Sequence, residues 1–348
     1  MSLPMRPLGR TNVQVPLICL GTMTFGEQNT QEDGFAQMDY ALAHGINFFD
    51  TAELYAIPPR HETYGATEII IGNWMQARRN RNDIFLASKV AGRSPMNWMR
   101  ADGSGSRVNK AQIDEAVAGS LKRLQTDHID LYQIHWPDRR INLFGGCSYR
   151  DYPDDYAAFE EILAALDVWV KKGAIRHIGV SNESPWGVMR FVEEAARNGL
   201  PRIVSIQNAY NLLNRTFEMG LAEIAMREHV GLLAYSPLGQ GYLTGKYLDG
   251  ARPAGARTTL FNRGQRYEGP SADAAIRAYV SLAADHKLTP AQLALKFCAT
   301  RPFMTSVIIG ATTMEQLTHD LDAFDAPWNE ELEKAVEQLQ ATYPNPCP

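Results

Sequence analysis

Four residues whose side chains could share one proton transfer stand where apolar runs give way to loops. These are Asp50, Tyr55, Lys89 and His135, each at the end of an expected strand or just after it. A free tyrosine is a poor acid at neutral pH, with a pKa of about 10. A neighbouring lysine, itself held by an aspartate, would lower that pKa, and a histidine could orient a carbonyl group beside the phenol. The combination therefore suggests the reduction of an aldehyde or ketone.

Each of the four residues also has a simpler explanation. Asp50 could cap a turn, Tyr55 could be a half-buried aromatic residue, and His135 could be a core histidine. Lys89 is harder to explain in this way, because a lysine that closes an apolar strand needs a counter-ion. The functional interpretation rests on the whole set, since all four residues are expected at the same end of three different strands.

The elements that would position these residues alternate regularly along the chain. A hairpin is expected around Gly9 and Arg10, followed by a first strand at 17–20. Further helices are expected over 31–43, 67–78, 109–124, 156–171, 185–197, 216–228, 272–286, 290–300, 313–324 and 329–342. Further strands are expected over 46–50, 84–90, 129–135, 175–181, 203–208, 231–236 and 305–310. These strands are apolar and β-branched almost throughout, as in parallel strands buried on both faces.

This rhythm predicts a (β/α)8 TIM barrel that forms one domain over residues 1–348, with an N-terminal β-hairpin and extra C-terminal helices. The alternative is a doubly wound sheet, which normally carries a GxGxxG turn after its first strand. Here that strand ends in GTMTFG, without the third glycine and the following helix. Two long loops, 136–156 after barrel strand 4 and 237–267 after barrel strand 7, are candidates for a substrate lid and a cofactor clasp.

Composition narrows the functional classes. The net charge of −5 favours neither nucleic acid nor an anionic membrane surface as a partner. No secretory signal and no run of about 18 apolar residues occurs. The histidines lack the spacing of a metal site, so we expect no metal. The cysteines are too scattered for a disulfide framework, which favours a cytoplasmic location; they are Cys19, Cys147, Cys298 and Cys347.

At the level of motifs, the chain resembles the aldo-keto reductases. The resemblance covers nearly the whole chain and is closest to the bacterial Tas-like branch, near the potassium-channel β-subunit group. The strings that carry it occur in family order: DTAELY, SKV, QIHWP, GVSN, IQNAYN, AYSPLGQGYLTGKY and IIGATTMEQL. The resemblance implies NADPH-dependent reduction of aldehydes or ketones to alcohols, with a small-molecule carbonyl compound as substrate.

Family roles then fall on the four residues. Tyr55 would donate the proton, Lys89 would lower its pKa, Asp50 would pair with Lys89, and His135 would position the carbonyl group. NADPH would supply the hydride, since no side chain can. The residues that the resemblance assigns to the cofactor are Gly21, Thr22, Met23, Ser181, Asn182, Gln207, Tyr235, Ser236, Pro237, Leu238, Gly239, Gly241, Lys246, Arg257, Gly310, Ala311, Thr312, Thr313, Gln316 and Asp320.

Two departures from the family pattern concern the cofactor. Many members carry Lys or Arg just after the glycine of the last strand and use it to select NADPH, whereas this chain reads GATT. The charge would then come from Lys246 or Arg257 in the long loop after barrel strand 7. Asp320 stands where the family commonly has an asparagine that contacts adenine. An ionised aspartate can accept hydrogen bonds from adenine but cannot donate them.

The expected substrate pocket is aromatic. Phe25, Trp136 and Phe144 would wall it beside Tyr55, which suits hydrophobic aldehydes and ketones. The kinship with channel β-subunits leaves a second function open, that of a regulatory subunit that binds a nicotinamide cofactor with little or no turnover.

Overall fold

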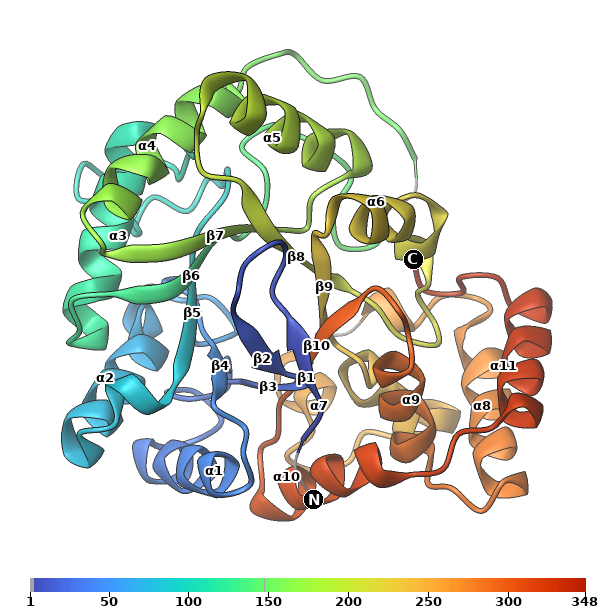
Figure 1. Ribbon diagram of the computed structural model, residues 1–348. Helices are drawn as coiled ribbons and strands as arrows, with labels where there is room; N and C mark the ends of the chain where they lie inside the picture. Colours follow the sequence, from blue (N-terminus) through green and yellow to red (C-terminus); the bar gives the residue numbers. More distant parts are fainter. Residues whose placement is uncertain (1–2, 147, 264) are drawn as a thin grey trace.

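The computed structural model describes residues 3–146, 148–263 and 265–348. Eight parallel strands close into a barrel in the order β10-β3-β4-β5-β6-β7-β8-β9, and helices surround it (Figure 1). The predicted (β/α)8 barrel is confirmed. The barrel strands are β3 (Ile18–Gly21), β4 (Phe48–Asp50), β5 (Phe85–Val90), β6 (Ile129–Ile134), β7 (Ile175–Ser181), β8 (Ile203–Ala209), β9 (Gly231–Tyr235) and β10 (Met304–Ile309).

The helices begin and end near the predicted residues, except for a short one in the long loop after β9, which was not predicted. They are α1 (Gln31–Ala43), α2 (Ala66–Arg78), α3 (Lys110–Leu124), α4 (Phe159–Lys171), α5 (Pro185–Asn198), α6 (Leu221–Glu228), α7 (Arg257–Phe261), α8 (Ala272–Asp285), α9 (Pro290–Ala299), α10 (Met314–Asp322) and α11 (Glu330–Thr342). Short 3-10 helices lie between them: η1 (His61–Thr63), η2 (Arg81–Asp83), η3 (Thr216–Met219), η4 (Gly239–Thr244), η5 (Leu248–Gly250), η6 (Gln265–Tyr267) and η7 (Ala323–Asp325).

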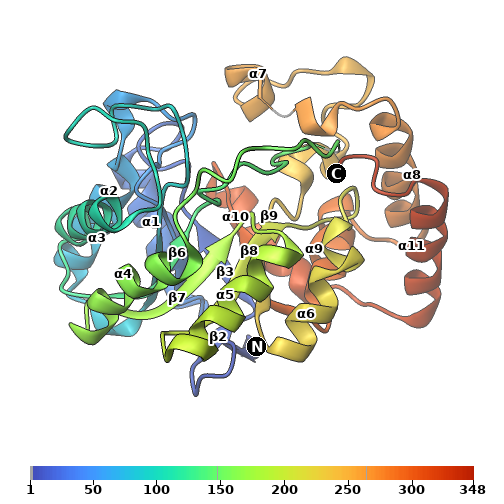
Figure 2. The ribbon, with the colours of Figure 1, turned by 90° about the horizontal axis from the view of Figure 1, so that it is seen from above.

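The N-terminal hairpin closes one end of the barrel. Strand β1 (Met5–Pro7) pairs antiparallel with β2 (Gln14–Pro16), as the sequence predicts. Leu8 and Val15 of this hairpin are buried in a cluster that includes Phe48 and Val204 from the barrel strands. The hairpin lies at one end of the barrel, and the long loops after β6 and β9 lie at the other (Figure 2). Because the hairpin covers one end of the barrel, we expect a functional site at the other end, where the long loops lie.

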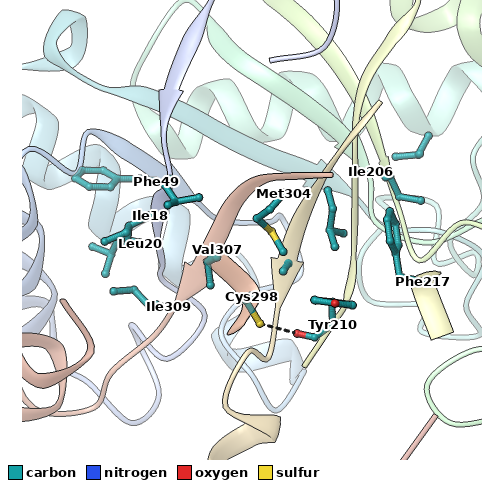
Figure 3. Packing of buried hydrophobic residues seen from close by; sticks show 14 of the residues in the cluster. Ile18, Leu20, Phe49, Ile206, Tyr210, Phe217, Cys298, Met304, Val307 and Ile309 are labelled. Atoms are coloured by element: carbon teal, nitrogen blue, oxygen red, sulfur yellow. Dashed lines mark hydrogen bonds between the residues drawn. The ribbon is translucent and has the colours of Figure 1, made fainter. Parts of the chain in front are cut away.

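A larger apolar core fills the space between the strands and the helices. Figure 3 shows part of it, where Ile18 of β3 and Val307 of β10 lie near each other with their neighbours. In the same region the Cys298 thiol donates a 3.6 Å hydrogen bond to the Tyr210 carbonyl (Figure 3). Burying both faces of the strands explains why their sequences are almost continuously apolar.

Several helices begin where capping residues stand in the sequence. Thr30 forms a capping box with Asp33 at the start of α1, and Thr289 forms one with Gln292 at the start of α9. Ser184 caps α5, and its hydroxyl accepts from Gly187 N. These local bonds fix the helix starts and hence the lengths of the loops that precede them.

Two helix starts differ from the predicted ones by three residues or more. Helix α4 begins at Phe159 instead of residue 156, because Ala157 N donates a 2.8 Å hydrogen bond to the Asp138 carboxylate and holds this segment in the loop. The helix expected over 216–228 is divided at Gly220 into η3 and α6. Glycine favours such a break because it has the lowest helix propensity after proline. In the described part of the chain no helix is long and apolar enough to cross a membrane.

Candidate active site

The four residues singled out by type lie together at the C-terminal end of the barrel. Asp50 ends β4, Lys89 is the second-last residue of β5, and His135 follows β6 directly. Tyr55 comes from the loop after β4. Lys89 Nζ donates to Asp50 Oδ2 at 2.6 Å and to Tyr55 Oη at 3.4 Å. The rings of Tyr55 and His135 meet edge to face with centroids 5.5 Å apart. Parallel strand ends meet at one rim of a barrel, and this brings the four residues together.

Further hydrogen bonds hold Asp50 and Lys89 in place. Asp50 Oδ1 accepts from Gln207 Nε2 at 2.8 Å and from Gln133 Nε2 at 3.2 Å. Lys89 Nζ also donates to the Thr51 carbonyl at 2.8 Å. Gln133 was not among the predicted site residues, although a polar residue near the C-terminal end of the buried strand β6 was a signal for it.

Lys89 remains charged although its side chain is completely buried. Burial is the largest single effect and would lower its pKa, but the Asp50 carboxylate and the Tyr55 phenol together outweigh it, and the pKa is raised above its ordinary value. A fixed ammonium group therefore stands beside the phenol of Tyr55.

The pKa of Tyr55 moves in the direction opposite to the one expected from the lysine alone. Burial raises the pKa of the phenol, and the nearby Lys89 cation opposes this only in part. The desolvation of a buried phenolate is thus the larger effect in this structure. Tyr55 is protonated at neutral pH, which is the state that a proton donor requires.

His135 is neutral in this environment. Burial lowers its pKa well below the ordinary value, and Lys89 lowers it further. Its backbone N donates to Val90 O at 2.9 Å, which continues the β5–β6 pairing beyond the strand. Its Nδ1 is buried without a hydrogen-bond partner among the described residues. A neutral imidazole with its proton on Nε2 could donate a hydrogen bond to a carbonyl oxygen.

The ends of β7, β8 and β9 bring together residues assigned to the cofactor. Tyr235 Oη donates to Asn182 Oδ1 at 2.7 Å, and Ser181 Oγ donates to Gln207 O at 2.7 Å. Asn182 Nδ2 also donates to the backbone carbonyl of His135 at 2.8 Å. These polar groups and the Tyr235 ring therefore lie directly beside the four-residue cluster.

The loop after β9 carries Ser236, Pro237, Leu238, Gly239 and Gly241, most of them in or next to η4. Gly241 has a φ of 92°, which a residue with a side chain rarely adopts. A Cβ there would lie 2.8 Å from Cε of Lys246, so the loop folds tightly against this lysine.

Arg257 at the start of α7 offers a test of whether this loop suits a phosphate-bearing cofactor. Its pKa is lowered by burial first and then by the nearby Arg263 cation. No carboxylate in the described ranges forms an ion pair with Arg257, whereas Arg252 in the same loop pairs with Glu268. A poorly solvated guanidinium without a counter-ion is costly. The residues present therefore fit an anionic group such as a nucleotide phosphate.

The segment after β10 carries the remaining predicted cofactor residues. Gly310, Ala311 and Thr312 lead to Thr313, which caps α10, and Gln316 Oε1 accepts from Thr312 N at 3.0 Å. Two side chains near α1 anchor this segment: Asn29 Nδ2 donates to Thr312 O at 2.9 Å, and Gln37 Nε2 donates to Ala311 O at 3.3 Å.

Asp320 on α10 is an unusual carboxyl group. The residue is 5% exposed, and its carboxyl has no hydrogen-bond partner in the described part of the chain. Burial raises its pKa to about 7, against a lowering effect of Lys246. The group can therefore be protonated near neutrality and could then donate a hydrogen bond, as an asparagine amide does.

The end of β3 is fastened to Asp50. Thr22 donates to the Asp50 carbonyl from its backbone N at 3.1 Å and from its hydroxyl at 2.8 Å. Gly21 precedes it, and Met23 O accepts from Ile57 N at 3.0 Å. The predicted residues Gly21, Thr22 and Met23 therefore lie at the rim beside the cluster.

The structure separates the three expected pocket aromatics. Trp136 packs beside His135, with ring centroids 4.9 Å apart, in a small cluster with Leu54 and Met99. Phe144 is 58% exposed on the loop after β6. Phe25 is 0% exposed and packs in the outer core against α1 and α2, so it has no surface to offer a substrate. Its nearness to a strand end in sequence does not set the direction of its side chain.

A separate cavity and the question of a metal site complete the description. A cavity of about 260 Å³ lies at the opposite end of the barrel, lined by residues that include Arg10, Arg176 and Arg202. It contains none of the four clustered residues. Among the described residues, no three His, Cys, Asp or Glu side chains are grouped so that they could hold a metal ion.

Comparison with known proteins identifies the family of the chain. The sequence model of the Aldo/keto reductase family matches residues 17–341. Protein tas of Escherichia coli strain K12 is 49% identical over 342 residues, which cover 97% of this chain and 98% of that protein. The uncharacterized oxidoreductase YrpG of Bacillus subtilis strain 168 is 35% identical over 97% of this chain and 95% of its own. A probable voltage-gated potassium channel subunit beta of Arabidopsis thaliana is 29% identical over 91% of this chain and 90% of its own. The chain belongs to the aldo-keto reductase family and is an oxidoreductase.

Proposed function

We propose that the protein reduces aldehydes or ketones to alcohols with NADPH, and that Tyr55 donates the proton. The observation that carries this proposal is the position of the Tyr55 phenol, 3.4 Å from Lys89 Nζ and edge to face with the His135 ring. The cluster lies at the C-terminal end of the barrel, where the active sites of such barrels lie.

Each residue of the cluster has a distinct part in this reaction. Bound NADPH would supply the hydride that the carbonyl carbon gains. Tyr55, protonated because burial raises its pKa, donates its proton to the carbonyl oxygen. The Lys89 ammonium stabilises the phenolate that remains, and Asp50 keeps Lys89 charged. The neutral imidazole of His135 orients the carbonyl oxygen by a hydrogen bond.

The chain's own side chains support the choice of a phosphorylated dinucleotide. Arg257 lacks a carboxylate partner within the described ranges, and Lys246 is a second cation in the same long loop after β9. Asn182, Gln207 and Tyr235 would contact the nicotinamide end, since they lie beside the catalytic cluster. The pocket above it would be lined by Trp136 together with Leu54 and Met99 from the same apolar cluster. Such a lining favours hydrophobic carbonyl compounds.

The test is NADPH consumption by the purified protein with a panel of aldehydes, ketones and quinones, run in parallel with NADH. We expect repeated turnover with at least one hydrophobic aldehyde and tighter binding of NADPH than of NADH. Equal or tighter binding of NADH in paired titrations would overturn the assignment of NADPH. Absence of turnover across the panel would overturn the assignment as a reductase.

A second function is motivated by the relative named as a probable potassium channel β subunit. On this alternative the protein binds a nicotinamide cofactor and acts as a regulatory subunit. The same turnover assay separates the two functions. A regulatory subunit would oxidise bound NADPH very slowly and only once per site, with no carbonyl compound that sustains turnover.

A further inference from the structure

A buried ion pair joins the loop that carries Tyr55 to the loop after β5. Arg100 donates two hydrogen bonds to the Glu53 carboxylate, from Nη2 to Oε1 at 2.8 Å and from Nη1 to Oε2 at 2.9 Å. Both side chains are 0% exposed. Removing two charges from water is so costly that apolar side chains of similar size are often equally stable in their place. Stability alone therefore does not account for this pair.

The Glu53 carboxylate extends the pairing between β4 and β5. Glu53 N donates to Lys89 O at 3.2 Å, as in a parallel ladder. The next backbone donor, Ala91 N just after β5, donates to the side-chain oxygen Glu53 Oε1 at 2.7 Å. The side chain thus continues the ladder at the point where the backbone turns toward Tyr55. The position of the Tyr55 turn relative to Lys89 depends directly on this carboxylate.

Arg100 connects the same carboxylate to the wall of the pocket. Its Nη1 also donates to the Met99 carbonyl at 3.1 Å, and its Nε donates to Gln112 Oε1 at 3.1 Å. The Met99 side chain packs with Leu54 and with Trp136, the neighbour of His135. One guanidinium group therefore links Glu53 to the segment whose Met99 packs in the apolar cluster beside His135.

We propose that Glu53 and Arg100 form a positioning pair, which sets the Tyr55 phenol against Lys89 and holds the pocket wall at Met99. The inference rests on the proposed carbonyl reduction. Neither residue touches the reacting atoms in this role. The two-point geometry of arginine and carboxylate defines an orientation as well as a distance. A displacement of about 1 Å at a catalytic group can cost roughly a hundredfold in rate.

The test compares two double variants that replace an ion pair by apolar side chains. E53L/R100M removes the positioning pair. R301M/E333L is the matched control, because Arg301 also binds Glu333 through two hydrogen bonds, at 2.8 and 2.5 Å, outside the barrel. We expect both variants to melt within a few degrees of the wild type. The kcat of E53L/R100M should fall roughly ten- to a hundredfold, while the control keeps its kcat and KM.

A further variant, Arg100→Lys, keeps the charge but lacks the planar fork, so its kcat should lie between the wild type and E53L/R100M. If E53L/R100M does not fold, Arg100→Lys alone gives the comparison with the control. Unchanged kcat and KM in the folded variants overturn the proposal.

Failure of the proposed function is a separate outcome, in which the wild type reduces no carbonyl compound. Crystal structures then decide, because a positioning role requires the distance from Lys89 Nζ to Tyr55 Oη, 3.4 Å here, to lengthen in E53L/R100M. An unchanged distance overturns the inference.

Discussion

Replacing Asp50 by asparagine removes the only carboxylate that the described structure pairs with the buried Lys89. Lys89 Nζ lies 2.6 Å from Asp50 Oδ2, and its side chain has no exposure to solvent. Breaking a buried ion pair by removing one partner typically costs about 3–5 kcal/mol, because the remaining charge is left uncompensated. Asparagine keeps the shape and can still accept from Gln207 through Oδ1, so the loss of charge is the main change.

The free energy of unfolding should depend on pH differently in the wild type and in Asp50→Asn. In the wild type the pKa of Lys89 is raised, so the stability from its pairing is present at neutral pH and is lost as the pH rises through that raised value. In Asp50→Asn burial loses its main opponent and only Tyr55 remains against it, so we expect the pKa of Lys89 to fall below the ordinary value of about 10.4. The variant should then gain stability between pH 7 and pH 9, where the wild type has no such gain from Lys89.

Urea unfolding of both proteins at pH 7 and pH 9 is the assay. We expect Asp50→Asn to be less stable by about 3–5 kcal/mol at pH 7 and by less at pH 9. A loss below about 1 kcal/mol at pH 7, the level of an exposed ion pair, would refute the reasoning. A difference in the free energy of unfolding that is the same at pH 7 and pH 9 would also contradict this prediction.

Two further predictions concern the cofactor loops. Arg257→Ala should raise the Kd of NADPH roughly tenfold or more, and that of NADH less, because it removes a partly buried cation without a carboxylate partner in the described ranges. Fluorescence titration measures both Kd values, and equal weakening would contradict a role at the 2′-phosphate. Asp320→Asn should gain stability relative to the wild type as the pH rises from 5 to 8. The buried carboxyl group of the wild type has a pKa of about 7 in the folded state, so the wild type loses stability as the pH rises toward this value, whereas asparagine does not titrate. The relative gain should reach about 3 kcal/mol in urea unfolding, given 1.36 kcal/mol per pKa unit; a constant difference over this range would contradict it.

The sequence was sufficient to predict the barrel and to predict that Asp50, Tyr55, Lys89 and His135 lie together, because both depend on short-range patterns. Apolar runs of strand length and helix caps such as Thr30 and Thr289 locate the elements, and a closed parallel barrel then brings its strand ends together. Asp50, Lys89 and His135 follow from this geometry alone. Helix interruptions such as Gly220 were less predictable, since a single glycine is tolerated in many helices.

What the sequence could not supply is the depth of burial and the direction of each side chain. The pKa of Tyr55 depends on how far its phenol is desolvated, which no local pattern records. Phe25 packs in the outer core, where Gly34 of α1 has no side chain and leaves room for its ring. The pairing of Glu53 with Arg100 joins residues far apart in the chain, and either residue alone resembles an ordinary surface charge.

The central claim is that Tyr55 donates the proton in carbonyl reduction. The most direct measurement compares wild type and Tyr55→Phe in NADPH oxidation with a hydrophobic aldehyde that the wild type turns over, while the binding of NADPH to each is measured by fluorescence. We expect Tyr55→Phe to bind NADPH as the wild type does and to lose turnover by roughly a hundredfold or more, in line with the ~10²–10⁴-fold contribution of a general acid. Turnover in Tyr55→Phe close to that of the wild type would contradict it.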